Sequence, residues 1–271
     1  MREFEYPFFA LGDQLTQEQI DFFDKYGFIH FKNFINQDTV QLLVNASLDV
    51  QKQFLEQDIK KVNGVPIKFG YDVDGSKIVQ RFAFTSLFSP VLHEFLLDPR
   101  FKALLALLGD GSDPRIGENE KDGMVLNHYI NTENSKFTKL GWHTDCLRDL
   151  FYFKKVMPML NVGIHLSTAV KGNGGLRIIP GSHKQSVFKM LFGKKHFIDH
   201  NPDPKEIGLS PKAGDLTVHD GRLWHRVAQS TIRGEQSRRR VIYIPMISGE
   251  YQPKNEDSPT LFYQRFSNLI K

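Results

Sequence analysis

The sequence contains a single cysteine, Cys146, among 271 residues. One thiol excludes an internal disulfide framework and a cysteine-rich zinc site. The chain also lacks any run of about 18 consecutive apolar residues, the length that a membrane-spanning helix needs. Its first residues carry charge where a signal peptide needs an apolar stretch. These features predict a cytoplasmic protein without a membrane span.

No charge of one sign dominates the composition. Lys and Arg number 35 and Asp and Glu number 31, which gives a formal net charge of +4. The basic residues occur in scattered pairs and triplets, whereas a nucleic-acid-binding protein usually shows a continuous basic surface. We therefore expect no nucleic-acid partner, while an anionic small molecule suits the same charge. The hydrophobic content of 40% is enough for a packed core and excludes intrinsic disorder.

The first 110 residues have mainly helical patterns. Thr16 and Gln19 form a capping box, and Gly27 is a suitable end for the helix between them. Either Asn36 or Asp38 can begin a second helix, whose apolar residues recur at helical spacing. Residues 64–84 read as a hairpin, and two shorter helices are expected from about residues 89 and 98, the second ending near residue 109.

The period of the hydrophobic pattern changes after residue 110. Short apolar runs are separated there by turn sequences such as Asn173-Gly174-Gly175 and Pro180-Gly181-Ser182. Many short strands with few helices between them favour an all-β barrel or jelly roll over a parallel doubly wound sheet. The expected strands are Met124 to Ile130, Val156 to Leu166, Leu176 to Ile179, Leu216 to His219, Leu223 to Ala228 and Val241 to Ile247.

We expect one domain over residues 1–271, because no repeat or Pro- and Ser-rich linker divides the chain. Residues 1–110 would form a mostly helical buttress and residues 111–250 the β-core. Residues 251–271 would form a C-terminal helix.

The segment Gly141-Trp142-His143-Thr144-Asp145 carries the clearest chemical signal. His143 and Asp145 are two residues apart, so in extended backbone their side chains leave the same face. His225, on a later strand, can supply a third ligand to a shared metal. Two histidines and one carboxylate on one side of a ferrous ion leave the other positions open to substrates and dioxygen. By itself, His-x-Asp also fits the solvated end of an ordinary strand.

Other motifs follow in a fixed order. They are the run from Asn173 to His183, the pair Gly214-Asp215, the distal His225 and the run from Arg239 to Tyr243. This set resembles the phytanoyl-CoA dioxygenase family of Fe(II)- and 2-oxoglutarate-dependent oxygenases over roughly residues 14–248. The resemblance implies a double-stranded β-helix, the cupin-like jelly roll, which agrees with the strand pattern.

The resemblance also implies roles for individual residues. His143, Asp145 and His225 would bind iron, and 2-oxoglutarate and dioxygen would be the cosubstrates. The family places an arginine on the strand after the distal histidine, where its planar fork can bind the far carboxylate of 2-oxoglutarate. Arg239 matches the family register best. The connection that precedes it is longer than usual, which leaves Arg238 and Arg240 as alternatives.

Three further residues are candidates for contact with 2-oxoglutarate. Asn127 lies on the strand before the His-x-Asp segment, and its side chain either bonds the cosubstrate or faces solvent. Tyr129 shares the face of Asn127 and could do the same. Thr144 points away from the metal in an ideal strand, so it reaches the cosubstrate only if the backbone curls there.

Two other histidines have simpler interpretations. His183 belongs to a Pro-Gly-Ser-His turn, where a structural role is favoured over metal binding. His219 precedes His225 by six residues, but the turn Asp220-Gly221 lies between them, so a shared facing is not assumed.

The expected reaction is hydroxylation of a small or lipid-like substrate that can carry an anionic group. A related desaturation or cyclisation also fits, whereas halogenating relatives replace the carboxylate that Asp145 provides. Residues 64–84, 131–140 and 146–156 would line the pocket. A non-redox, cupin-like metal- or carbohydrate-binding protein remains an alternative, and it would not need Arg239. A zinc hydrolase would need a glutamate base near the ligands, and none is obvious.

Overall fold

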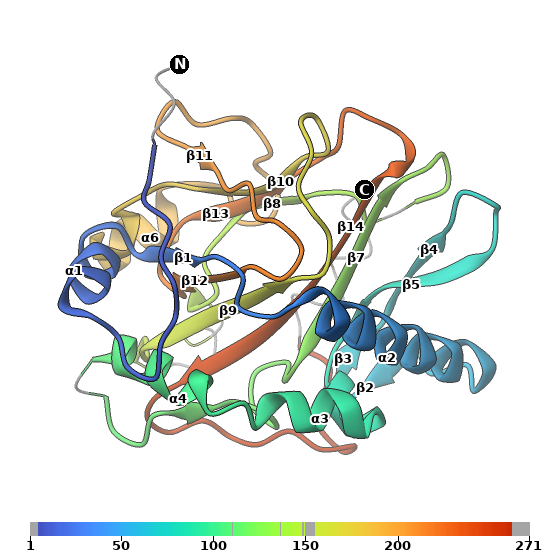
Figure 1. The fold of residues 1–271 in the computed structure, drawn as a ribbon, viewed down its shortest axis with the longest axis horizontal. Coiled ribbons are helices and arrows are strands. Elements are labelled where there is room, and N and C mark those ends of the chain that lie inside the picture. The colour runs from blue at the N-terminus through green and yellow to red at the C-terminus, as the bar shows by residue number, and fades with distance from the viewer. Residues whose placement is uncertain (1–4, 110, 136, 148, 150–154, 262–271) are drawn as a thin grey trace.

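The computed structural model describes residues 5–109, 111–135, 137–147, 149 and 155–261. Its centre is a pair of antiparallel sheets, with helices along the outside of the larger one (Figure 1). The larger sheet runs in the order β1 (Phe28–Phe31), β12 (Leu216–Asp220), β9 (Met159–His165), β14 (Gly234–Ile247), β7 (Val125–Asn131), β5 (Lys77–Phe82) and β4 (Lys68–Tyr71), with β6 (Arg115–Ile116) on β14. The smaller sheet runs in the order β11 (Ile207–Gly208), β10 (Gly175–Ile178), β13 (His225–Ala228) and β8 (Leu140–His143).

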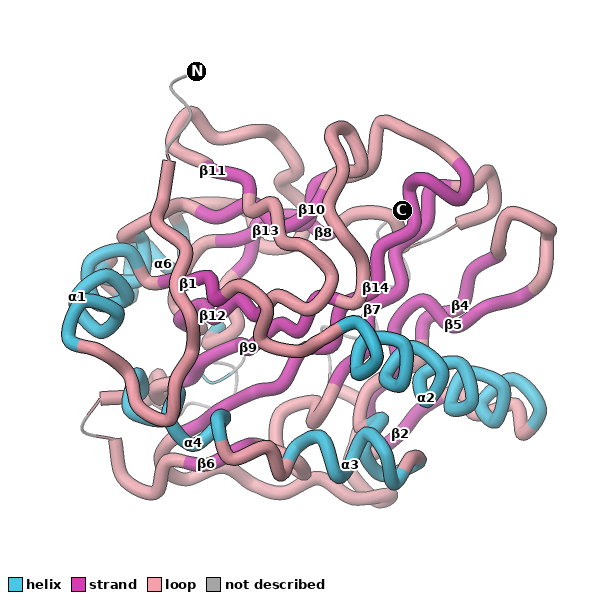
Figure 2. The backbone as a smooth tube through the Cα atoms, viewed as in Figure 1, coloured by secondary structure: helices cyan, strands magenta, loops and turns pink. Residues whose placement is uncertain are grey.

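Helices α2 and α3 cover one face of the larger sheet, as the tube in Figure 2 shows. Thr16 caps the first helix with the predicted capping box, and Asn36 rather than Asp38 caps the second. The helices are α1 (Gln17–Tyr26), α2 (Gln37–Glu56), α3 (Pro90–Leu96), α4 (Arg100–Leu104) and α6 (Val187–Phe192), with 3-10 turns η1 (Thr85–Phe88), η2 (Leu105–Leu108) and η3 (Ser182–Lys184). A separate two-stranded pair, β2 (Lys61–Val62) and β3 (Val65–Pro66), lies beside the hairpin of β4 and β5.

Alternation along the strands gives the larger sheet two different faces. On β9, Leu160, Val162 and Ile164 pack with the helices in the main hydrophobic core. Asn161 lies between them in sequence and faces the cavity between the sheets. Successive strand residues point to opposite sides, so one face holds the fold together while the other remains polar enough to bind ligands.

The helical half of the chain also contributes to the larger sheet. Residues Phe28–Phe31 pair with β12, and the hairpin at residues 68–82 extends the sheet beyond β7. The hairpin was expected, but its partner strand lies far away in sequence and cannot be read from a local pattern. A single hydrophobic core thus contains side chains from both residues 1–110 and residues 111–250.

The structure differs from the expectations in several places. Helix α6 and the short strands β6 and β11 were not expected, and β14 begins at Gly234 rather than Val241. Strand β8 was not among the expected strands, because its Gly141 and polar neighbours weaken the strand pattern. Residues 251–261 contain no helix, and the rest of the expected C-terminal helix lies outside the described residues. Among the helices of the described ranges, none combines the length and the apolar character needed to span a membrane.

Candidate metal centre

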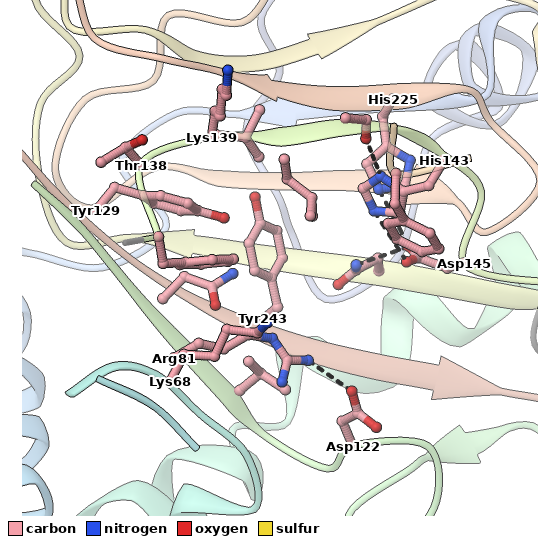
Figure 3. A pocket seen from close by; sticks show the side chains of 18 of the residues that line it. Lys68, Arg81, Asp122, Tyr129, Thr138, Lys139, His143, Asp145, His225 and Tyr243 are labelled. Carbon is pink, nitrogen blue, oxygen red and sulfur yellow. Dashed lines mark hydrogen bonds and ion pairs between the residues drawn. The ribbon is translucent and has the colours of Figure 1, made fainter. Parts of the chain in front are cut away.

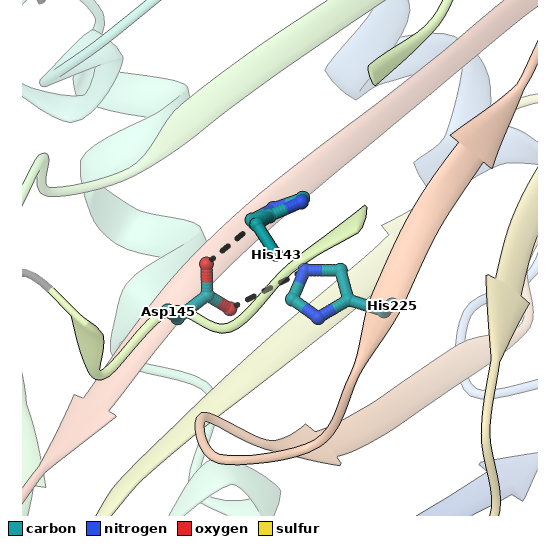
Figure 4. Close-up of side chains that lie close together, drawn as sticks. All are labelled: His143, Asp145 and His225. Carbon is teal, nitrogen blue, oxygen red and sulfur yellow. Dashed lines mark ion pairs between the residues drawn. The ribbon is translucent and has the colours of Figure 1, made fainter. Parts of the chain in front are cut away.

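Three side chains converge between the two sheets. His143, Asp145 and His225 each offer one ligand atom, and these atoms lie within 4.8 Å of one another (Figure 4). His143 ends β8, Asp145 follows it in a turn, and His225 begins β13. The two strands pair so that His143 and His225 are direct cross-strand neighbours, with ring centroids 4.0 Å apart. The pairing of β8 with β13 therefore brings together residues that are 82 positions apart in the sequence.

Both imidazole rings are held by the same local device. The Nδ1–H of His143 donates to the carbonyl oxygen of Gly141 at 2.8 Å, and the Nδ1–H of His225 donates to the carbonyl oxygen of Leu223 at 3.0 Å. A carbonyl oxygen can only accept, so Nδ1 carries the proton in each ring. Each Nε2 then has a free lone pair for a metal. The Nε2 of His143 lies 3.9 Å from Oδ1 of Asp145, and the Nε2 of His225 lies 3.7 Å from Oδ2.

The protonation states of the three groups suit a divalent cation. Burial lowers the pKa of His143 to about 4, and burial together with His143 holds the pKa of His225 well below its usual range. Burial raises the pKa of Asp145, but the neighbouring imidazoles of His225, His219 and His143 outweigh this effect and hold it well below the ordinary value. Neutral imidazoles and an ionised carboxylate are the forms that bind metal ions.

Two residues behind the ligands were not identified from the sequence. The side-chain amide of Asn161 donates to Oδ2 of Asp145 at 3.0 Å, and Nε2 of His219 lies 3.4 Å from the same oxygen. His219 also lies beside His225, with ring centroids 4.5 Å apart. Asn161 and His219 face each other across β9 and β12. Alternation along β12 predicts on which side of the strand the His219 side chain lies. That β9, with Asn161, is the neighbouring strand follows only from the sheet topology.

A cavity of about 1390 Å³ extends from the three ligands between the two sheets. Figure 3 shows the His143, Asp145 and His225 cluster at one side and Lys68, Arg81 and Lys139 farther along the cavity. Burial lowers the pKa of Lys68 to about 8, and Arg81 donates to Asp122 at 2.7 Å. Residues 64–84 and 131–140 contribute to the lining of the cavity, as expected. From the third expected segment, residues 146–156, Leu147 lines the cavity. Residues 148 and 150–154 of that segment lie outside the described ranges.

Asn127, Tyr129 and Thr144 all line this cavity. The buried Oδ1 of Asn127, hydroxyl of Tyr129 and Oγ1 of Thr144 each lack a hydrogen-bond partner among the described residues. Buried polar atoms without partners are uncommon in folded proteins, so three around one cavity fit a polar ligand. Thr144 faces the cavity because β8 ends at His143 and the backbone turns there.

The three arginines of β14 have different surroundings. Arg238 is held by Asp72, Glu235 and His128. Arg239 pairs with Tyr129 in the register of β14 and β7, and its guanidinium carbon lies 4.8 Å from the centre of the Tyr129 ring.

The side chain of Arg239 borders a small cavity of about 40 Å³, which shares Tyr129 and Tyr243 with the large one. Its Nη2 donates to the carbonyl oxygen of Ala228 at 3.4 Å, and its buried Nε has no partner in the described part of the chain. Arg240 borders the same small cavity, and its buried Nε also has no partner among the described residues. The engagement of Arg238 therefore leaves Arg239 and Arg240 as the arginines able to receive a carboxylate.

Comparison with known proteins gives one family and several similar structures. The model of the family described as Phytanoyl-CoA dioxygenase (PhyH) matches residues 23–240. Ectoine dioxygenases from Bordetella parapertussis and Bordetella bronchiseptica are 22% identical over 226 and 228 residues, which is 78% of this chain. The chain spans 66% of the length of each of these curated relatives.

Among solved structures, the non-heme alpha ketoglutarate dependent carbocyclase SnoK from nogalamycin biosynthesis has a TM-score of 0.64 at 15% identity, covering 96% of this chain and 93% of its own. EctD from S. alaskensis, solved with 2-oxoglutarate and 5-hydroxyectoine, has a TM-score of 0.62 at 17% identity, covering 92% and 83%. HygX from Streptomyces hygroscopicus, solved with nickel and 2-oxoglutarate, has a TM-score of 0.59 at 18% identity, covering 93% and 94%. At these identities the likeness concerns the fold, and it confirms the predicted jelly roll.

Proposed function

Because the chain belongs to the phytanoyl-CoA dioxygenase family, we propose that it is a non-haem Fe(II)- and 2-oxoglutarate-dependent oxygenase. Its reaction would hydroxylate a small or lipid-like substrate and release succinate and carbon dioxide. The observation that carries this proposal is the convergence of His143, Asp145 and His225, in metal-binding protonation states, at one end of a large cavity.

In this proposal His143, Asp145 and His225 hold the iron. When bound, ferrous iron with 2-oxoglutarate and dioxygen supplies the oxidation of an otherwise unreactive C–H bond. The protein orients the two imidazoles through the carbonyl oxygens of Gly141 and Leu223, which also fix the proton on Nδ1. Asn161 fixes the carboxylate of Asp145 from behind, so none of the three ligands has to find its orientation during binding.

The cosubstrate would lie against the larger sheet. Arg239 is the proposed anchor of its far carboxylate, supported by its unpartnered Nε and by its position beside Tyr129. Burial raises the pKa of Tyr129 to about 12, so its hydroxyl keeps its proton and can donate to a carboxylate oxygen. Thr144 would complete the contacts by donating from its unpartnered hydroxyl, and Asn127 by donating from its side-chain amide nitrogen.

The prime substrate would occupy the rest of the cavity. Apolar side chains such as Phe69, Phe137 and Leu147 line much of it, while Lys68 brings positive charge beside the ion pair of Arg81 and Asp122. We propose a substrate with an apolar body and an anionic group that reaches Lys68. Such a group would also raise the pKa of Lys68 again, because an opposite charge favours the protonated amine.

The test is anaerobic addition of Fe(II) and 2-oxoglutarate to the purified protein, with the visible metal-to-ligand charge-transfer band as the readout. We expect the band in the wild type and in the surface control His93→Ala, and its loss in Asp145→Ala. Arg239→Ala should keep iron binding but need more 2-oxoglutarate to develop the band.

A wild-type protein that shows no band, or an unchanged band in Asp145→Ala, would contradict the proposed oxygenase. Iron binding without any response to 2-oxoglutarate would favour a non-redox, cupin-like metal-binding protein. Once the band is established, succinate release in air can be used to screen apolar carboxylates and phosphates as substrates.

A further inference from the structure

Helix α6 carries the two most exposed large apolar side chains of the described chain. Phe188 is 73% exposed and Phe192 is 70% exposed. They are four residues apart on one helix face, and their ring centroids lie 5.0 Å apart (the helix is labelled in Figure 1). Val187, the first residue of the helix, and Ile198, six residues after Phe192, are also exposed by half or more. Neighbouring apolar side chains in water at this density mark an interaction surface.

The same segment is rich in lysine. Residues 184–198 contain four lysines and no Asp or Glu, and Asp199 follows directly. Lys184 pairs with Asp24 and Lys194 pairs with Asp203. Within the described ranges, no ion pair involves Lys189 or Lys195. We call Val187, Phe188, Phe192 and Ile198, together with Lys189 and Lys195, the α6 patch.

The α6 patch reaches the wall of the cavity. Ile198 both belongs to the patch and lines the cavity, and the ring of Phe197 before it stacks on His143 with centroids 4.8 Å apart. On the inner side, Nε2 of His196 lies 2.8 Å from the carbonyl oxygen of the buried Met190. The patch is therefore the outer surface of a segment whose inner surface forms part of the cavity wall.

We propose that the α6 patch docks this protein on the surface of an anionic phospholipid bilayer. Phe188 and Phe192 would enter the interface between headgroups and acyl chains, and Lys189 and Lys195 would lie against lipid phosphates. Aromatic rings beside lysines are the composition of helices that lie on membranes, where apolar burial and attraction to anionic lipid add together. An amphiphilic substrate could then pass from the bilayer into the cavity beside Ile198.

A second copy of the chain is a poorer partner for this surface. In a two-fold dimer each patch would face its own equivalent, which places Lys189 and Lys195 close to the same lysines of the other copy. Like charges brought together in an interface oppose association. An anionic lipid surface matches both the apolar centre and the basic rim.

The experiment is sedimentation of the full chain with vesicles. We expect binding to vesicles made of equal parts phosphatidylcholine and phosphatidylglycerol, and about tenfold weaker binding to phosphatidylcholine alone. Phe188→Ser with Phe192→Ser should weaken binding about tenfold or more, since the apolar contribution is removed. Lys189→Glu with Lys195→Glu should abolish the preference for anionic lipid.

The matched control is Leu42→Ser with Leu97→Ser, which removes two exposed leucines from α2 and from the end of α3, and it should bind like the wild type. As a second measurement, Trp placed by Phe188→Trp should shift its emission to shorter wavelength when anionic vesicles are added. Binding requires neither iron nor turnover, so this test is independent of the proposed reaction.

Failure of the wild type to bind anionic vesicles, or equal binding by the Phe188→Ser, Phe192→Ser variant, would overturn the proposal. A wild-type dimer that this variant converts to monomer would also overturn it, because the patch would then be an interface between copies.

Discussion

At the scale of single residues, the carboxylate of Asp145 has two polar side chains behind it. Its Oδ2 accepts from Asn161 at 3.0 Å and lies 3.4 Å from Nε2 of His219. Both neighbours come from the larger sheet, whereas His143 and His225 come from the smaller one. The carboxylate therefore links the two sheets at the site where we propose that iron binds.

The first prediction concerns Asn161. Replacing it by Ala removes the donor that orients Asp145, and we expect Fe(II) affinity to fall by about 10- to 100-fold, the usual effect of losing such a support. Anaerobic metal titration measures this change. Asn45→Ala, on the solvent side of α2, should leave the affinity unchanged. An unchanged affinity in Asn161→Ala would mean that Asp145 is oriented without this bond.

The second prediction concerns Asp215, a buried carboxylate outside the metal centre. Its oxygens accept from His30 at 3.0 Å and from the backbone N–H groups of Asn33 and Lys212. Burial raises the pKa of Asp215, but these hydrogen bonds outweigh that effect and lower it below its ordinary value. A carboxyl group whose pKa is lower in the folded protein than in the unfolded chain stabilises the fold at pH values above the unfolded pKa. This contribution disappears as the pH falls through the folded pKa.

We therefore expect Asp215→Asn to reduce the free energy of unfolding by about 2 kcal/mol at neutral pH. The difference from the wild type should shrink once the pH is well below about 4. Urea denaturation at several pH values measures both quantities, with the exposed Asp13→Asn as control. A difference that stays constant down to acid pH would assign the loss to shape rather than to charge.

At the scale of elements, β8 depends on a close backbone approach. A Cβ added at Gly141 would come within 2.5 Å of the carbonyl oxygen of Phe197 and 2.6 Å of its carbonyl carbon. Backbone hydrogen bonds join Trp142 to Asp199 and to Phe197 across the same contact. The absence of a side chain at Gly141 therefore lets the backbone of Phe197 and Asp199 lie directly on β8, the strand that carries His143.

The third prediction is that Gly141→Ala destabilises the protein by about 1–3 kcal/mol, because the added methyl group overpacks a backbone contact. It should also weaken Fe(II) binding, since Phe197 would move away from His143. Thermal unfolding and metal titration measure the two effects. Gly12→Ala is the matched control, because the nearest neighbour of the added methyl group would be the carbonyl oxygen of Gln14 at an ordinary 3.7 Å. Equal stability of the two variants would contradict the role given to this contact.

The sequence predicts elements better than their partners. The caps of α1 and α2 and the turn of the β4–β5 hairpin depend on neighbouring residues, and each is found close to its expected position. His143 and Asp145 could be paired from their spacing, whereas His225 was only a candidate on a later strand until the family resemblance implied its role as the third ligand. Asn161 and His219 were missed because their approach to Asp145 depends on the register of β9 with β12, which is a long-range property of the sheet.

At the scale of the whole molecule, ligand binding and folding are coupled. Anything that binds only the folded chain stabilises it by about 2.7 kcal/mol at a concentration 100 times its dissociation constant. For a chain of this size that corresponds to a rise in melting temperature of about 5–10 °C. The fourth prediction is such a rise when Ni(II) and 2-oxoglutarate are added together, measured by calorimetry. Asp145→Ala should show little or no rise, and a full rise in that variant would place the binding elsewhere.

The position of β8 gives the metal centre a second consequence. β8 is the outermost strand of the smaller sheet, and its ladder with β13 shifts register between His225 and Val227. An ion bound by both His143 and His225 would link β8 to β13 where their pairing is irregular. Metal loading would then fasten this edge strand as it completes the metal centre. Removal of the metal by a chelator would free β8 and stop the reaction together.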